Sequence, residues 1–159
     1  MNNLLILTIG VFSIINTEMG VIGILPLISS SYGIDIATAG LLVSLFALTV
    51  AISGPTLPLL FSRYDRKKIM ILVLTIFLVC NIISAFAMSF NVVVIARVLP
   101  AFFHPVYVSL AFSVASSSVK PEDIPKSVSK IMIGVSAGMV LGVPIVSYIA
   151  SITSLKVAM

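Results

Sequence analysis

The sequence predicts an all-α integral membrane protein with five transmembrane helices. Of its 159 residues, 60% are hydrophobic and only 9% are charged. A soluble domain usually carries about 25% charged residues, so this chain has too few charges to cover a water-facing surface. The apolar residues also gather in five runs, each close to the roughly 20 residues that a helix needs to cross a bilayer. These runs lack the alternating pattern of β-barrel strands, which favours helices.

The predicted spans follow one another with short connections, so residues 1–159 are interpreted as one partial transmembrane bundle in contact with lipid. The five spans are expected at about residues 4–28, 37–61, 69–88, 92–115 and 131–152. The first run is longer than the apolar segment of a cleavable signal peptide, and no basic residue precedes it. We therefore expect this run to be retained as a helix.

Basic residues lie in alternate connections, which predicts the orientation of the chain. The second connection holds Arg63, Arg66, Lys67 and Lys68, and the fourth holds Lys120, Lys126 and Lys130. The first and third connections hold none. The positive-inside rule places the basic connections in the cytoplasm. We therefore expect a multi-pass protein of the cell membrane with a cytoplasmic amino terminus, and the net charge of +4 is no sign of nucleic-acid binding.

Prolines interrupt several of the predicted spans. They are Pro26, Pro55, Pro58, Pro100, Pro105 and Pro144. Proline lacks the backbone N–H and tends to kink a helix, and membrane helices tolerate it where neighbours or water satisfy the freed carbonyl. Bent helices around a cavity and ordinary variation in proline-tolerant helices both fit this pattern.

The fifth span carries a regular stripe of small residues. Gly134, Gly138 and Gly142 recur every four residues, and Pro144 follows them. Residues at this spacing lie on one helix face, and such a smooth face lets another helix approach closely. We expect a helix-packing motif here, and the alternative is a direct role in substrate binding.

Three ionisable residues lie inside predicted spans, where such side chains usually face the bundle interior and find partners. At 1.5 Å per residue, Glu18 lies about 20 Å from the inner end of the first span. Arg97 lies about 8 Å from the outer end of the fourth span, and His104 falls close to its midpoint. A pair between Glu18 and either basic residue is possible if the first and fourth helices are neighbours.

The role of Glu18 has two interpretations. A buried ion pair could simply hold two helices together. Alternatively, the carboxylate could gain and lose a proton as a cavity opens to each side of the membrane, which a proton-coupling site requires. Asn16 and Thr17 could bond the carboxyl group or a polar substrate, and His104 could be a second proton site or a hydrogen-bonding core residue.

Four stretches resemble signatures of one transporter family. In "NTEMGVIGILPLIS", Thr17, Glu18, Gly23, Leu25 and Pro26 match its first-helix signature. The other stretches match the loop between helices two and three, the fourth helix and the fifth helix; they are "PLLFSRYDRKK", "ARVLPAFFHPVYVSLA" and "GVSAGMVLGVPIVSYIA". In the loop, Arg63, Arg66 and Lys67 match, whereas Pro58, Ser62 and Asp65 replace Gly, Asp and Gly. Arg97, His104 and the glycines before Pro144 are in place, with Ala101 and Pro105 at positions that are often glycine.

The chain thus resembles the amino-terminal part of a major facilitator superfamily transporter, of the twelve-helix drug- and sugar-efflux antiporter branch. The resemblance implies alternating access, proton coupling, a small-molecule substrate and a central site walled partly by helices one and four. Five spans make an incomplete amino-terminal six-helix bundle of that fold. We therefore expect a truncated reading frame or a fragment that lacks the carboxy-terminal half needed for transport.

Two other functions compete with transport. The chain could be a small accessory membrane protein that packs against a larger partner through the glycine stripe. An intramembrane enzyme is less favoured, because no metal-ligand spacing and no nucleophile–base pair stands out in the sequence. We accordingly expect no enzyme activity, no cofactor and no metal.

Overall fold

The computed structural model describes residues 2–159, which form helices and no strand. The elements, in chain order, are α1 (Asn2–Tyr32), α2 (Ile36–Ser53), α3 (Leu57–Phe61), α4 (Arg66–Ala85), α5 (Phe90–Ser117), η1 (Pro121–Asp123), α6 (Ile124–Ile152) and α7 (Leu155–Ala158). Among them, α1, α2, α4, α5 and α6 are long and apolar enough to cross a membrane. The predicted all-α membrane fold with five spanning helices is confirmed.

The helix bounds differ from the expected ranges most clearly in the second span. The run at 37–61 is not one helix, because α2 ends at Ser53 and α3 begins only at Leu57. Pro55 and Pro58 lie at this break, and neither can donate the N–H that would continue the helix. Elsewhere α1 runs on to Tyr32, and α6 begins at Ile124, seven residues before the expected 131. These extensions are polar, so hydropathy alone did not include them.

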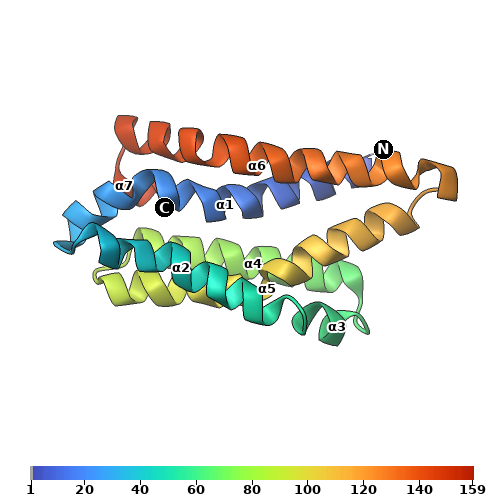
Figure 1. The fold of residues 1–159 in the computed structure, drawn as a ribbon, viewed down its shortest axis with the longest axis horizontal. Helices are drawn as coiled ribbons and strands as arrows, with labels where there is room; N and C mark the ends of the chain where they lie inside the picture. Colours follow the sequence, from blue (N-terminus) through green and yellow to red (C-terminus); the bar gives the residue numbers. More distant parts are fainter. Residues whose placement is uncertain (1) are drawn as a thin grey trace.

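The other prolines lie within continuous helices. Pro26 is inside α1, Pro100 and Pro105 are inside α5, and Pro144 is inside α6. In Figure 1, the last part of α5 diverges from the α2 side of the bundle and rises toward the start of α6. The proline-containing middle of α5 is also where His104 lies, so the bend and the ionisable site share one segment.

Aspartates cap two helices at their amino termini. Asp35 accepts a hydrogen bond of 2.5 Å from the Thr38 backbone N–H at the start of α2, and Asp65 accepts one of 2.8 Å from the Lys68 backbone N–H at the start of α4. Each bond satisfies an otherwise free N–H of the first helical turn. Asp65, expected as part of the loop motif, therefore defines where α4 begins.

The helices pack around α1, which lies beside α6 along most of its length and also contacts α2 and α5 (Figure 1). Two hydrophobic clusters fill the interior: one includes Val11, Val73 and Tyr107, and the other includes Ile24, Leu42 and Val93. Many large apolar side chains remain exposed on the outer surface, as in Leu78, Ile95 and Val140. A bundle that leaves such side chains outside is suited to lipid.

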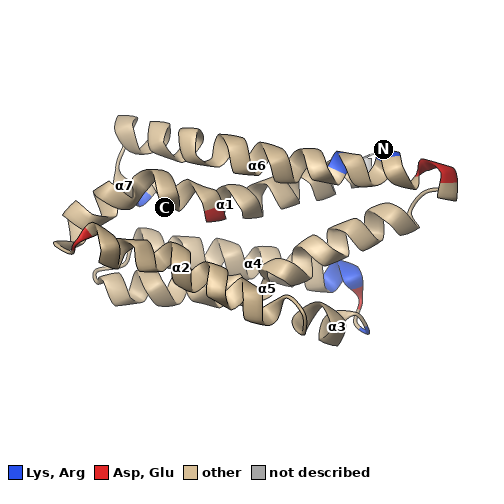
Figure 2. Cartoon of the chain, viewed as in Figure 1, with Lys and Arg blue, Asp and Glu red and all other residues tan. Residues whose placement is uncertain are grey.

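Charged residues gather at the two ends of the bundle (Figure 2). The end that carries both basic connections, together with the chain's amino terminus, is called the basic end here; its cations are Arg63, Arg66, Lys67, Lys68, Lys120, Lys126 and Lys130. The opposite end carries Asp35 and Lys156. The lysines and arginines of alternate connections therefore lie at one end of the bundle, as the positive-inside pattern requires.

Candidate functional site

Glu18 of α1 and His104 of α5 meet inside the bundle. The Glu18 Oε2 atom lies 3.2 Å from His104 Nε2, within ion-pair distance. The two groups are close but are not aligned for a hydrogen bond, and His104 Nε2 has no other partner among residues 2–159. The side chains are 21% and 11% exposed, respectively. This geometry favours a pair that can approach further by small side-chain rotations.

Arg97, one of the two basic residues considered as a partner for Glu18, is bound differently. Its Nη1 donates a hydrogen bond of 2.7 Å to the backbone carbonyl of Thr17. The side chain is buried, and no carboxylate in the described chain lies within 4.0 Å of it. Its Nε is also without a hydrogen-bond partner there. The guanidinium thus anchors the backbone next to Glu18 and leaves the carboxylate free to face His104.

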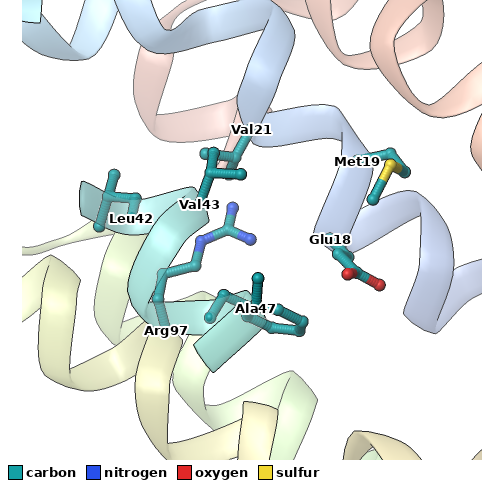
Figure 3. Close-up of a pocket in the computed structure, with 8 residues that line it drawn as sticks. Glu18, Met19, Val21, Leu42, Val43, Ala47 and Arg97 are labelled. Atoms are coloured by element: carbon teal, nitrogen blue, oxygen red, sulfur yellow. The ribbon is translucent and has the colours of Figure 1, made fainter. Parts of the chain in front are cut away.

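A small pocket separates Glu18 from Arg97 (Figure 3). It has a volume of about 120 Å³ and is lined by Glu18, Met19, Val21, Leu42, Val43, Phe46, Ala47 and Arg97. Figure 3 shows the carboxylate and the guanidinium on different helices, with Val43 and Ala47 beside the guanidinium. Drug-sized ligands occupy about 300–1,000 Å³, so this pocket fits a few water molecules rather than such a ligand.

Several neighbours of this site were not anticipated from the sequence. Phe46 of α2 lies edge-on to the His104 ring, with centroids 5.8 Å apart. Asn81 of α4 contacts the Thr17 hydroxyl at 3.5 Å, the limit of a hydrogen bond. Asn81 is a polar residue inside the third apolar run, and this position in the sequence could have indicated that it faces the bundle interior. Nothing in the sequence distinguishes Phe46 from the chain's other aromatic residues.

Asn16 and Thr17, expected to bond the carboxyl group or a substrate, behave differently from each other. Thr17 provides the carbonyl that holds Arg97. The Oδ1 atom of Asn16 is buried without a hydrogen-bond partner in the described chain. Neither residue bonds the Glu18 carboxylate directly in the described chain. Thr17 therefore acts on the site through its backbone, and Asn16 retains an unused acceptor.

The glycines of α6 lie against α1. A Cβ atom added to Gly134 would lie 2.5 Å from the Thr8 carbonyl oxygen, and one added to Gly138 would lie 2.7 Å from Ile15 Cβ. At Gly142 the nearest atom is Met19 Cβ, 3.0 Å away. Since normal carbon–carbon contacts lie near 3.5–4.0 Å, a side chain at Gly134 or Gly138 would force its neighbours to move, and Gly142 is also tightly packed. The stripe is a helix-packing surface that holds α6 beside the helix of Glu18.

Two further glycines on α1 complete this contact. Added Cβ atoms at Gly20 and Gly23 would collide with Val146 and Ser147 of α6, respectively. Pro144 lies in the same part of α6. Gly23 had been noted only as part of the first-helix signature. The packing therefore uses small residues on both helices.

The loop motif at the basic end makes one contact between helices. Arg66 Nη1 donates a hydrogen bond of 3.0 Å to the Ser117 hydroxyl, which joins the start of α4 to the end of α5. Arg63 and Lys67 are exposed. The motif residues and the Glu18 site are thus separate features at different depths of the bundle.

Comparison with known proteins decides the family. The family model of the Major Facilitator Superfamily matches residues 7–159. The chain belongs to the major facilitator superfamily. This confirms the resemblance to the superfamily that was drawn from the four sequence stretches.

Individual relatives are also transporters by name. The chain is 34% identical over 147 residues to an uncharacterized MFS-type transporter, YfhI, and 36% identical over 146 residues to another, YtbD, both from Bacillus subtilis (strain 168). It is 31% identical over 146 residues to the inner membrane transport protein YdhP of Escherichia coli (strain K12). Each match covers 92% of this chain, but only 37%, 37% and 38% of the respective relatives.

Proposed function

We propose that this chain forms part of a proton-coupled exporter of drugs or sugars that works by alternating access. The supporting observation is the Glu18–His104 pair, which lies inside the bundle at 3.2 Å. The chain spans 37% of the length of two Bacillus relatives, so transport is proposed for the whole protein. Within it, this part supplies the proton-coupling carboxylate, and the remainder supplies the rest of the substrate cavity.

A carboxylate in this position suits proton coupling because its charged form is costly in an apolar environment. Six of the eight residues that line its pocket have apolar side chains: Met19, Val21, Leu42, Val43, Phe46 and Ala47. Removing an ion from water costs several kcal/mol, whereas the protonated acid is neutral. Binding and release of a proton therefore change the stability of each conformation, which is the basis of coupling.

The orientation follows from the charges. We propose that the basic end faces the cytoplasm, since it gathers the lysines and arginines of the second and fourth connections. The amino terminus is then cytoplasmic, and the connection that contains Asp35 is outside. In this orientation a substrate exported by the protein leaves through the end that carries Asp35, and a proton moves toward the basic end.

The accessory-protein alternative is weakened by the packing of α6. It required the glycine stripe to receive a partner, but Gly134, Gly138 and Gly142 are buried against α1 of the same chain. A second membrane protein cannot use this surface unless α1 leaves it. The stripe therefore supports an intramolecular role.

Transport by inverted membrane vesicles tests the proposal. The test uses a full-length transporter that carries this chain as its amino-terminal part. The compounds offered to it are a panel of labelled sugars and lipophilic dyes. A proton gradient, acidic inside, should drive accumulation of at least one compound, and a protonophore should abolish it. A Glu122→Gln variant, altered in a different acid near the basic end, should accumulate the compound normally. The absence of gradient-driven accumulation across the panel would contradict the proposal.

A further inference from the structure

His104 also lines a second space, different from the pocket of Glu18 and Arg97. This is an open groove between α2–α3 and α5, lined by Val50, Gly54, Pro55, Pro58, Leu59, His104, Pro105, Val108 and Ser109. From His104 its walls follow the chain segments that lead to the basic end. The groove and the Glu18 pocket have no lining residue in common. His104 lines the groove and lies 3.2 Å from Glu18, which lines the pocket, so the pair connects the two spaces.

The two nitrogens of the His104 ring are in different situations. Nε2 lies 3.2 Å from the Glu18 carboxylate. Nδ1 is buried and has no hydrogen-bond partner among residues 2–159. A buried polar atom without a partner is costly, and water at the inner end of the groove is the simplest partner for it. The ring thus has one nitrogen for the acid and one nitrogen available for water.

Among the residues that line the groove, His104 is the one with an ionisable side chain. The groove's remaining lining residues are aliphatic residues, glycine, prolines and the hydroxyl of Ser109. Pro58 has no N–H to give to the carbonyl of Gly54, four residues earlier. His104 is therefore the ionisable residue that joins this groove to Glu18.

We propose that His104 relays the proton between Glu18 and the groove that leads to the basic end, so that the carboxylate exchanges with that side through the ring. This rests on the proposed role of Glu18 and adds the route. Histidine is suited to such transfer because one ring nitrogen can accept a proton while the other releases one.

The relay balances as follows in the direction of proton release toward the basic end. His104 starts neutral, with its proton on Nδ1. The protonated Glu18 carboxyl gives its proton to Nε2, which leaves a carboxylate beside an imidazolium. The Nδ1 proton then passes to water in the groove, and the ring is neutral with its proton on Nε2. Loss of the Nε2 proton to water and uptake of a proton from water at Nδ1 restore the first tautomer.

Other charged groups near the ring are few in the described chain. From α1 the ring faces Glu18, and from α2 it faces the uncharged Phe46. On its own helix, Arg97 lies two turns away and is held by the Thr17 carbonyl. Glu18 is thus the charged group that lies within ion-pair distance of the ring in the described chain.

Two spectroscopic measurements on the purified 159-residue chain test the relay. The chain holds a single histidine, so ¹⁵N NMR in lipid nanodiscs reports both ring nitrogens without assignment. Glu18→Gln should change the resonance of Nε2, the nitrogen that lies beside the carboxylate. In a second measurement, the chain is inserted in one orientation in proteoliposomes and the pH is lowered suddenly on one side. Time-resolved infrared spectroscopy then follows the carboxyl band of Glu18, which is identified because it is absent from Glu18→Gln.

Sidedness provides the decisive comparison. After a jump on the basic side, His104→Gln should slow protonation of Glu18 by about 10²-fold or more, the scale of general acid–base transfer. The rate after a jump on the opposite side should not change. Thr75→Ala, an exposed position on α4 that lines neither the groove nor the Glu18 pocket, should behave as the wild type. NMR spectra of each variant report whether its fold is retained.

Three results would overturn the relay. The first is a folded His104→Gln variant in which Glu18 is protonated from the basic side at the wild-type rate. This result would rule out the relay but not the proposed role of Glu18. Another is equal slowing from both sides, which indicates a general disturbance of the site. The third is a wild-type Glu18 band that never changes with pH, and this result would remove the proposed function together with the relay.

Discussion

Gly138→Ala should destabilise the bundle although it adds only one methyl group. The new Cβ would lie 2.7 Å from Ile15 Cβ and 3.1 Å from the Phe12 carbonyl oxygen. A normal carbon–carbon contact is about 3.5–4.0 Å, so α1 and α6 must separate by roughly 1 Å. Overpacking of this kind costs about 1–3 kcal/mol, and we expect the free energy of unfolding to fall by that amount.

The matched control is Gly40→Ala in α2. A Cβ at Gly40 meets no atom within 4 Å, and alanine favours a helix over glycine by up to about 1 kcal/mol. This variant should be as stable as the parent chain or more so. The comparison separates the effect of close packing from the general effect of replacing a glycine in a helix.

Dye-to-dye energy transfer measures the separation of the two helices directly. The chain, with Cys80 replaced by alanine, carries one dye at Ile9 on α1 and one at Ile133 on α6, both exposed positions. Transfer efficiency is followed as the denaturing detergent fraction in mixed micelles is raised. A Gly138→Ala variant that loses transfer at the same detergent fraction as its parent would refute the close-packing argument.

Two further predictions concern the ends of the bundle. In a Cys80→Ala background, a cysteine at exposed Ser30 should react with an impermeant thiol reagent outside intact cells, and one at exposed Ser118 should not; the reverse pattern would contradict the orientation. At Asp35, hydrogen bonds from the Thr38 backbone and side chain hold the carboxyl pKa below its ordinary value of 3.8. Because the folded pKa is lowered, the cap's contribution to stability is present above the unfolded pKa and is lost as the pH falls through the folded pKa. A ¹³C NMR titration of Asp35 with a midpoint at or above 3.8 would contradict this.

The sequence predicted the features that follow from hydropathy and spacing. Five apolar runs were sufficient for five spanning helices, and the spacing of Gly134, Gly138 and Gly142 indicated the face that now lies against α1. The interruption between Ser53 and Leu57 was missed because hydropathy remains high through Pro55 and Pro58. Apolar character determines whether a segment enters the membrane, whereas a missing N–H determines whether its helix continues.

The partner of Glu18 could not be chosen from the sequence. Arg97 and His104 are both at a suitable depth, and only the packing of α1 against α5 brings His104 to 3.2 Å. The same packing places the Thr17 carbonyl where it accepts the hydrogen bond from Arg97. Depth along a helix is fixed by residue number, but the facing direction also depends on the rotation of each helix, which five interacting helices set together.

Proton movement driven by a substrate gradient tests the central claim most directly. A full-length transporter that carries this chain is reconstituted in lightly buffered liposomes with a pH-sensitive dye, and a transported compound is supplied on one side. The wild-type protein should move protons in the opposite direction as the compound flows. Glu18→Gln, which keeps the shape of the side chain but cannot exchange a proton, should still exchange labelled for unlabelled compound without moving protons. Proton movement at the wild-type rate by a folded Glu18→Gln protein would contradict the claim that this carboxylate couples the proton to transport.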